Sequence, residues 1–361
     1  MVKEFDRKII LEDGQEYYGY GFGAHNEKVC EIVFNTSMVG YQEILSDPSY
    51  TYQAVVMTYP LIGNYGMADD DYERDTPTLG ALVVREYNDE PSNFRSTATL
   101  SEVMEKFGIP GIYGIDTRKL NRSIRDFGSR KVLITDIFTP LEEGIAKLKS
   151  TDIPTDAVSR VSCDKIMISY AETQKYHVVA IDCGMKMNIV RSLNKRDCKV
   201  TIVPWNTPAE AIVALEPDGI FISNGPGDPR EVTCVVELIG ALKGRVPLFG
   251  IDLGCELTAL ACGGQVTAMK AGHRGSNHPI RNEKNGKIEF ALQNHAFAVC
   301  AESLTGTGLT VTHTNLLDGT VEGIADESTM VLAVQHHPGT VSGARGVSYL
   351  YEEFVDLMKD F

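Results

Sequence analysis

Asp252 stands at a point in the sequence where a reactive side chain is expected. The apolar run over 246–251 has the pattern of a buried parallel strand. Gly250 and Gly254 bracket Asp252 and allow a sharp turn, and leucines at helical spacing follow. A strand, a tight turn and a helix in this order form an elbow, which holds one side chain out of the sheet while backbone N–H groups face the same point. Such an elbow suits a nucleophile, and an aspartate is an unusual choice for it.

Two further segments carry groups that could act together with Asp252. The loop Asn224-Gly-Pro-Gly-Asp-Pro229 follows a predicted strand, and N–H groups around Gly225 and Gly227 could hold a carbonyl, a carboxylate or an oxyanion. His337, in His336-His-Pro-Gly339, also follows a predicted strand and is placed for general base work. Each segment also has a purely structural explanation, a tight turn for the first and structural histidines for the second.

The elements that must position these residues alternate between strand and helix. Strands are predicted at 177–181, 199–203, 218–223 and 246–251, with helices between them. This order predicts a mostly parallel, doubly wound sheet, in which ligands bind at the carboxyl ends of the strands. We therefore expect the glycine-rich loop and Asp252 to line one crevice. The chain from about residue 265 is rich in strand signals.

The N-terminal part of the chain is predicted to form a separate, strand-rich α/β domain. A chain of 361 residues is long enough for two domains with their own cores. The first strands form a hairpin around the turn Asp13-Gly14. The polar, weakly periodic stretch 151–176 is interpreted as a linker, which gives domains of 1–150 and 177–361.

The composition argues against several classes of protein. A formal net charge of −15 argues against a nucleic-acid partner. No apolar run is long enough to span a membrane. The eight cysteines are spread singly without a Cys-x-x-Cys pair, so neither a zinc framework nor a disulfide scaffold is expected. With no apolar signal region at the start, the sequence favours a cytoplasmic, reduced protein.

Taken together, the motifs resemble a known family. Those of the C-terminal half resemble class I glutamine amidotransferase domains: the elbow, the loop 224–229, Gly272-His-Arg-Gly-Ser-Asn-His-Pro279, Gln293-Asn-His295 and His337-Pro338. The N-terminal half is similar to the small subunit of carbamoyl phosphate synthetase. The motifs that carry this likeness are 34–50, Thr58-Tyr-Pro-Leu-Ile-Gly-Asn-Tyr-Gly66, Pro91-Ser-Asn-Phe-Arg95 and Gly114-Ile-Asp-Thr-Arg-Lys-Leu120. The resemblance covers nearly the whole chain.

The resemblance implies a subunit that hydrolyses glutamine. Its ammonia passes to a large ATP-dependent subunit, a ligase that makes carbamoyl phosphate for arginine and pyrimidine biosynthesis. The implied partner is that large subunit, and ATP and Mg²⁺ would belong to it, so this chain is expected to hold neither cofactor nor metal. The positions that match the family's glutamine contacts are Ser49, Gly225, Gly227, Leu253, Asn294 and Phe297.

The chain departs from the family at its reacting groups. The family uses a cysteine at the elbow and a His-Pro-Glu motif to activate it. Here Asp252 takes the place of the cysteine and Gly339 that of the glutamate, while His337 remains. Glu256 stands at a substrate-contacting glutamine position and Ala296 at a glycine position. A carboxylate is a weak nucleophile toward an amide, and its charge beside the oxyanion donors would oppose a developing oxyanion.

Three interpretations follow for this altered site. We favour a homologue that has lost glutaminase activity, a pseudoenzyme that acts as a structural or regulatory partner of an ammonia-using large subunit. The second is a repurposed pocket, either a hydrolase that uses Asp252 and His337 or a cation site of Asp252, Glu256 and the pair His336-His337. The third is an ordinary glutamine-hydrolysing subunit. Cys255 is a poor replacement nucleophile, because its place on the helix points it away from the elbow.

Overall fold

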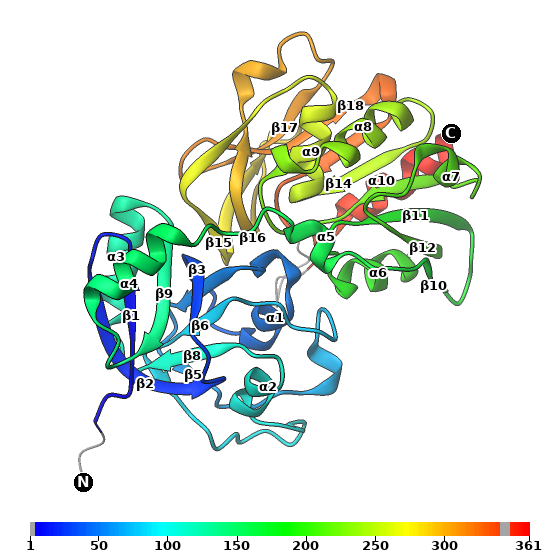
Figure 1. The fold of residues 1–361 in the computed structure, drawn as a ribbon. Coiled ribbons are helices and arrows are strands. Elements are labelled where there is room, and N and C mark those ends of the chain that lie inside the picture. The colour runs from blue at the N-terminus through cyan, green and yellow to red at the C-terminus, as the bar shows by residue number, and fades with distance from the viewer. Residues whose placement is uncertain (1–3, 340–346) are drawn as a thin grey trace. The chain divides into compact units, whose positions relative to one another are not determined.

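A computed structural model describes residues 4–339 and 347–361 of the chain (Figure 1). Contacts between residues divide the chain into two compact units, Met1–Pro154 and Thr155–Phe361. Both units combine strands and helices, and the first is rich in strands, as the sequence analysis predicts. No helix in the described residues is long and apolar enough to cross a membrane.

The N-terminal unit is built on a closed sheet with the strand order β1-β2-β8-β6-β4-β3-β9. Its elements are β1 (Arg7–Leu11), β2 (Glu16–Gly23), β3 (Lys28–Asn35), α1 (Tyr41–Ser46), β4 (Gln53–Met57), β5 (Leu61–Ile62), β6 (Ala81–Val83), β7 (Glu86–Tyr87), α2 (Leu100–Lys106), β8 (Pro110–Tyr113), α3 (Thr117–Phe127), β9 (Arg130–Asp136) and α4 (Leu141–Ser150). Strands β1 and β2 form the predicted hairpin.

Alternation of side chains along the strands gives this unit two cores. On β4, Ala54 and Val56 pack with Leu120 and Ile124 of α3, whereas Val55 and Met57 belong to a second cluster. The second cluster is covered by α1 and α2, through buried residues that include Leu45, Leu100 and Met104. Since β4 is buried on both faces, its nearly continuous apolar sequence is the one expected for a central strand.

The C-terminal unit contains a ten-stranded sheet of order β10-β12-β11-β13-β14-β19-β18-β17-β15-β16. Its elements are α5 (Ala157–Val161), β10 (Met167–Ser169), β11 (Tyr176–Asp182), α6 (Met187–Asn194), β12 (Cys198–Pro204), α7 (Ala209–Val213), β13 (Gly219–Ile222), α8 (Thr233–Leu242), β14 (Leu248–Ile251), α9 (Leu253–Ala261), β15 (Val266–Asn282), β16 (Ile288–Val299), β17 (Thr310–Asn315), β18 (Val321–Asp326), β19 (Val331–Val334) and α10 (Tyr349–Asp360).

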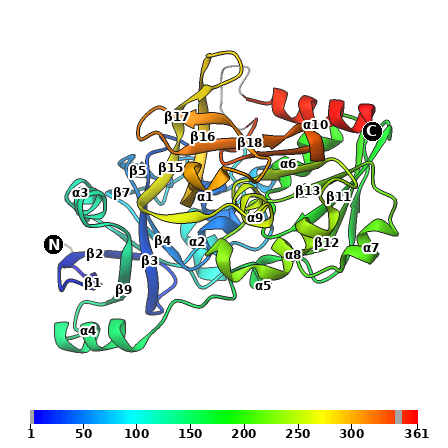
Figure 2. The ribbon, with the colours of Figure 1, turned by 90° about the horizontal axis from the view of Figure 1, so that it is seen from above.

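The parallel core of this sheet is the predicted doubly wound arrangement. Strands β12, β11, β13, β14 and β19 pair in parallel, and the remaining pairs are antiparallel. Helices α7, α8 and α9 pack on one face and α6 and α10 on the other, and each face has its own apolar cluster. Figure 2 shows α10 and α6 on the opposite side of the sheet from α7 and α8.

The predicted linker contains regular structure, and the cysteines form no disulfides in the described residues. The stretch 151–176, interpreted as a linker, contains α5 and β10, and β10 pairs with β12 at the edge of the C-terminal sheet. The apolar run Ile166-Met-Ile168 supplies this strand, although its side chains are exposed. All eight cysteines are free thiols, in agreement with the absence of a disulfide scaffold.

Candidate functional site

Asp252 occupies the apex of a tight elbow between β14 and α9. Its backbone has φ 58° and ψ −115°, a conformation that L-residues seldom adopt and that costs about 1–3 kcal/mol. The surroundings enforce it: the Asp252 N–H donates to the Val334 carbonyl at 2.8 Å, and its own carbonyl accepts from the Cys255 N–H at 2.9 Å. A Cβ atom at Gly254 would lie 2.3 Å from the Ile222 carbonyl oxygen, so only glycine lets the helix approach the sheet here.

The Asp252 carboxylate shares one amide donor with a second buried acid. Gln335 donates from Nε2 to Glu256 Oε1 at 2.9 Å and, at 3.4 Å, to Asp252 Oδ1. Glu256 lies one helical turn beyond the apex, where its N–H donates to the Asp252 carbonyl at 3.2 Å. Asp252, Glu256 and Gln335, here called the acid pair and its amide, are each at most 3% exposed.

Burial and charge decide the protonation state of this acid pair. Burial raises the pKa of Glu256 well above its usual value, and the charges of Asp252 and Asp228 raise it further. The hydrogen bond from Gln335 acts in the opposite direction but is outweighed. Two adjacent carboxylates in a dry site oppose each other's ionisation, so the surroundings of Glu256 favour its protonated form. The elbow therefore carries two carboxyl groups side by side.

His337 lies where the sequence analysis places it, just past the carboxyl end of β19. Its N–H donates to the Leu292 carbonyl at 2.9 Å, and its side chain is 2% exposed. Burial lowers the pKa of His337 well below the usual value, and the positive charge of Lys186 lowers it further. Because β14 and β19 are parallel neighbours with Ile251 opposite Val334, Asp252 and His337 emerge at the same edge of the sheet.

Gly339 replaces the carboxylate that would orient such a histidine, and its backbone suits glycine alone. It has φ 94°, in the left-handed region that L side chains rarely adopt. A side chain there would have space, since the nearest atoms lie 3.9–4.0 Å from a Cβ. The obstacle to a glutamate is therefore the local chain path, which continues into residues outside the described part.

The glycine-rich loop after β13 is joined to the loop after β11. Asn224 accepts from the Lys186 N–H at 3.1 Å and donates from its amide to the Gly184 carbonyl at 3.1 Å. A Cβ at Gly225 would lie 2.2 Å from the Cys183 carbonyl oxygen and 2.8 Å from Leu253, so the loop packs tightly against both. Gly227 follows with φ 92°. The glycine-rich loop and Asp252 thus follow adjacent parallel strands, β13 and β14, as predicted.

The other residues predicted to contact glutamine lie on α9, on β16 and in the N-terminal unit. Leu253 begins α9 and is buried, and Asn294 lies buried on β16, opposite Arg274 of β15. Ala296 and Phe297 are half-buried on β16, and the Arg230 guanidinium lies 5.4 Å from the Phe297 ring centroid. This contact brings Phe297 to the glycine-rich loop. Ser49 belongs to the other unit, in the 3₁₀ turn Pro48–Tyr50, and its role in the site stays a prediction.

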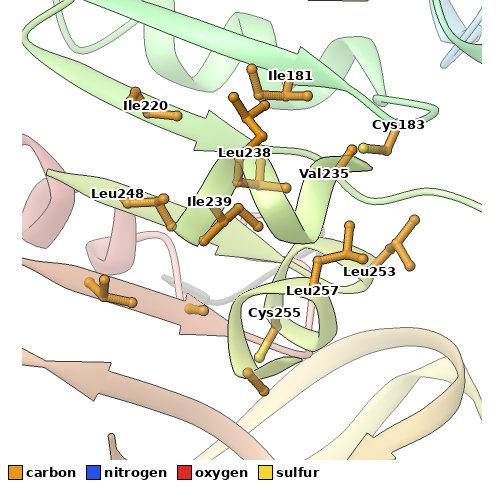
Figure 3. Close-up of a cluster of buried hydrophobic side chains, with 14 of the residues drawn as sticks. Ile181, Cys183, Ile220, Val235, Leu238, Ile239, Leu248, Leu253, Cys255 and Leu257 are labelled. Atoms are coloured by element: carbon orange, nitrogen blue, oxygen red, sulfur yellow. The ribbon is translucent and has the colours of Figure 1, made fainter. Parts of the chain in front are cut away.

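Cys255 points into the core and not toward the crevice, as predicted. Its side chain is fully buried in a cluster with Leu257 and Val235 (Figure 3). Burial raises the pKa of this thiol well above its usual value, and the charges of Glu256 and Glu322 raise it further. A neutral, enclosed thiol is inert, because the thiolate is the nucleophile.

Sequence reasoning missed two residues of the site, Gln335 and Lys186. Both directly follow or lie near the carboxyl end of a buried strand, which is the signal that identified Asp252 and His337. The proposed cation set was too broad: the side chain of Gln335 faces the acid pair, whereas His336 Nδ1 lies 3.8 Å from Glu322, away from it. In the described residues, Asp252, Glu256, His336 and His337 do not form a group of converging metal ligands.

Family models match both halves of the chain. Residues 9–134 match the family described as carbamoyl-phosphate synthase small chain, CPSase domain, and residues 179–357 match glutamine amidotransferase class-I. A solved glutamine amidotransferase from Thermotoga maritima aligns with 51% of this chain and 83% of its own, at 16% identity and a TM-score of 0.36.

Curated relatives are similar over almost the entire chain. A carbamoyl phosphate synthase small chain of Staphylococcus haemolyticus is 48% identical over 355 residues, covering 98% of this chain and 96% of the relative. One from Fusobacterium nucleatum is 47% identical over 351 residues, covering 97% of this chain and 98% of the relative. The chain therefore belongs to the carbamoyl phosphate synthase small-chain family, with a class I glutamine amidotransferase domain as its C-terminal half.

Proposed function

We propose that this chain does not hydrolyse glutamine and acts as a structural or regulatory partner of a large carbamoyl phosphate synthase subunit that uses free ammonia. The observation that carries the proposal is the acid pair: the elbow presents Asp252 beside Glu256, whose pKa is raised by burial, and both accept from the Gln335 amide. The place of the nucleophile is filled by a carboxyl group that is engaged with its neighbours.

The chemistry of amide hydrolysis supports the loss. Attack by the Asp252 carboxylate on a glutamine side chain would form an anhydride and expel ammonia, an uphill exchange of a stable amide for a reactive acyl group. Charge on Asp252 beside the helix start would also oppose the oxyanion that the elbow normally stabilises. His337 is held neutral, and Gly339 offers no carboxylate to orient it. The buried Cys255 thiol supplies no substitute.

The retained N-terminal half supports a partner role. The small-chain match covers 9–134, and relatives that share this half are named small chains, which implies a large chain beside them. Met38 and Val39, within the motif 34–50, are 69% and 66% exposed. Such apolar side chains on a loop are suited to contact with another protein. Under this proposal ATP and Mg²⁺ bind to the large subunit, and arginine or pyrimidine synthesis receives the product.

The test separates the two halves of the proposal. The purified chain is mixed with its large subunit, and carbamoyl phosphate formation is measured with ammonia and with glutamine as nitrogen source. We expect co-elution of the two chains and synthesis from ammonia only, with no glutamate released from glutamine. The matched control is Asp252→Ala, which should behave as the parent chain. Glutamine hydrolysis that Asp252→Ala abolishes would overturn the loss of glutaminase activity, and failure to co-elute would overturn the partner role.

A further inference from the structure

Behind the elbow, the antiparallel part of the sheet gathers a second group of buried polar residues. His273 of β15 and His295 of β16 are directly opposite each other in the strand register. Glu322 of β18 joins them, and one ligand atom of each residue lies within 4.8 Å of the others. All three side chains are at most 10% exposed. We propose that His273, His295 and Glu322 bind a divalent transition metal ion of the zinc class.

The hydrogen bonds around the two histidines decide which nitrogen of each ring faces the site. His295 Nδ1 lies 2.7 Å from the Phe297 carbonyl, which can only accept, so Nδ1 carries the hydrogen and Nε2 carries a lone pair. His273 Nε2 lies 2.9 Å from Asp318 Oδ2, which turns Nδ1 toward Glu322 Oε1 at 3.7 Å. The Asn315 amide nitrogen lies 3.3 Å from the same Nδ1, so a metal would take the place of this contact. A carboxylate or carbonyl behind each imidazole is the arrangement that orients histidines toward metals.

His295 Nε2 distinguishes a metal from a proton as the occupant. A proton on His273 Nδ1 would satisfy Glu322, but it would leave Nε2 of His295 unused. That nitrogen is buried and has no hydrogen-bond partner among the described residues. Burial lowers the pKa of His295 to about 3, so the ring stays neutral and its lone pair stays available. A metal ion would use all three ligand atoms at once.

Glu322 is prepared to serve as the charged ligand. It is fully buried, Oε1 accepts from Asn315 at 2.7 Å, and Oε2 accepts from Gln293 at 2.6 Å. Each oxygen keeps a further lone pair for a metal. Burial alone would raise the pKa of Glu322, but hydrogen bonding to His273 and His336 outweighs it and lowers the pKa below its usual value. A divalent ion would neutralise this carboxylate in place.

The size of the site agrees with zinc after a small contraction. Zinc binds histidine nitrogen and carboxylate oxygen at about 2.0–2.2 Å, so ligand atoms in a tetrahedral site lie about 3.5 Å apart. The 4.8 Å limit here therefore requires shifts of about 1 Å, which imidazole rotation can supply. Two histidines and one carboxylate leave a fourth position for water. Because the ligands come from three strands, the metal would tie β15, β16 and β18 together.

The experiment uses the whole chain and the metal alone as the probe. Metal-free protein is titrated with Zn²⁺, bound metal is quantified after dialysis, and Co²⁺ is added to read a tetrahedral ligand field in the visible spectrum. We expect one ion per chain and a rise in the unfolding temperature on binding. Glu322→Gln should abolish the stoichiometric binding, whereas His278→Gln should leave it intact. His278 is the matched control because its ring lies 5.1 Å from His273 but outside the ligand set.

A second variant keeps the proposal falsifiable if Glu322→Gln fails to fold. Asp318 is 39% exposed, and it contacts His273 through Oδ2 while Oδ1 accepts from Thr320. Asp318→Asn should therefore fold and weaken zinc binding about 10–100-fold. Absence of stoichiometric zinc in the parent chain would overturn the proposal. Zinc bound equally well by the parent, Glu322→Gln and Asp318→Asn would also overturn it, since the metal would then lie elsewhere.

Discussion

Two buried glutamates of the C-terminal unit, Glu256 and Glu322, are both hydrogen-bonded to Gln335, but their surroundings shift the pKa of their carboxyl groups in opposite directions. Gln335 donates from its N–H to the Glu322 carbonyl at 2.9 Å and from its side chain to Glu256 at 2.9 Å. Both carboxyl groups are fully buried, yet the pKa of Glu256 is raised and that of Glu322 is lowered. Burial is equal in the two cases, so the neighbouring groups set the direction of each pKa shift.

The neighbours differ in sign. Glu256 faces the carboxylates of Asp252 and Asp228 and has one amide donor. Glu322 faces His273 and His336 and has two amide donors. The acid pair at the elbow has one shared amide donor, whereas the carboxylate of Glu322 accepts from two amides. The comparison separates a site whose surroundings oppose a negative charge from a site organised around an anion.

The largest expected effect comes from removing Glu322. Glu322→Ala leaves Asn315, Gln293 and two imidazoles buried without their acceptor, and we expect a loss of about 3–5 kcal/mol in unfolding free energy. Denaturant unfolding of the metal-free chain measures it. Glu210→Ala, at an exposed glutamate of α7, is the control and should leave stability unchanged. A loss no greater than that of the control would mean that Glu322 is not held as an anion.

The protonation of Glu256 predicts a pH dependence. A glutamate whose pKa is raised on folding binds its proton more tightly in the folded state, so stability falls as pH rises from the unfolded pKa near 4.3 toward the folded value. Glu256→Gln removes this dependence. We expect the variant to gain stability relative to the parent by about 1.4 kcal/mol per pH unit above pH of about 4.3.

Unfolding free energies of parent and variant across this pH range provide the measurement. Glu210→Gln is again the control, because an exposed glutamate should give parallel curves. Parallel curves for Glu256→Gln as well would show that Glu256 is ionised in the folded chain, and the contrast with Glu322 would disappear.

Gln335 allows a smaller test of the acid pair alone. Gln335→Leu introduces an apolar side chain of similar size and removes the donor to Glu256 and Asp252. We expect the unfolding free energy to fall by about 1.5–3 kcal/mol at neutral pH. The loss should shrink in acid, where both carboxyl groups are protonated. Thermal unfolding at two pH values checks this, and a loss that does not change with pH would mean that only packing was disturbed.

Asp318 gives the smallest expected effect on stability. Its contact with His273 is partly exposed, so Asp318→Asn should change the unfolding free energy of the metal-free chain by about 0.2–1 kcal/mol. The change should be larger when zinc is present, since the variant binds the ion more weakly. An equal change in unfolding free energy with and without zinc would show that Asp318 does not support a metal site.

The sequence predicted the local features of the candidate site well. The elbow at Asp252 was predictable because strand, glycine turn and helix follow one another directly, and the structure confirms it. The inward direction of Cys255 was predictable from helical geometry and is confirmed by its burial. The partner role and the loss of glutaminase activity stay predictions, because they depend on chemistry that geometry alone does not measure.

Contacts between distant strands were not predictable. Gln335 directly follows β19 and contacts Glu256, which lies 79 residues earlier in the chain. His273, His295 and Glu322 meet only because the antiparallel strands align in one register. A shift of one residue would turn each of these side chains to the opposite face of the sheet. The positions of the single histidines in the sequence do not predict that register.

The sequence by itself determined which groups are present at the elbow: a carboxyl at 252, another at 256 and no side chain at 339. It also determined the alternation of strands and helices that brings their positions to one edge of a parallel sheet. Only the tertiary structure decided the charge that each buried group carries. The physical reason is that a pKa in a dry interior depends on the few atoms within hydrogen-bonding reach, and those atoms come from segments far apart in the chain.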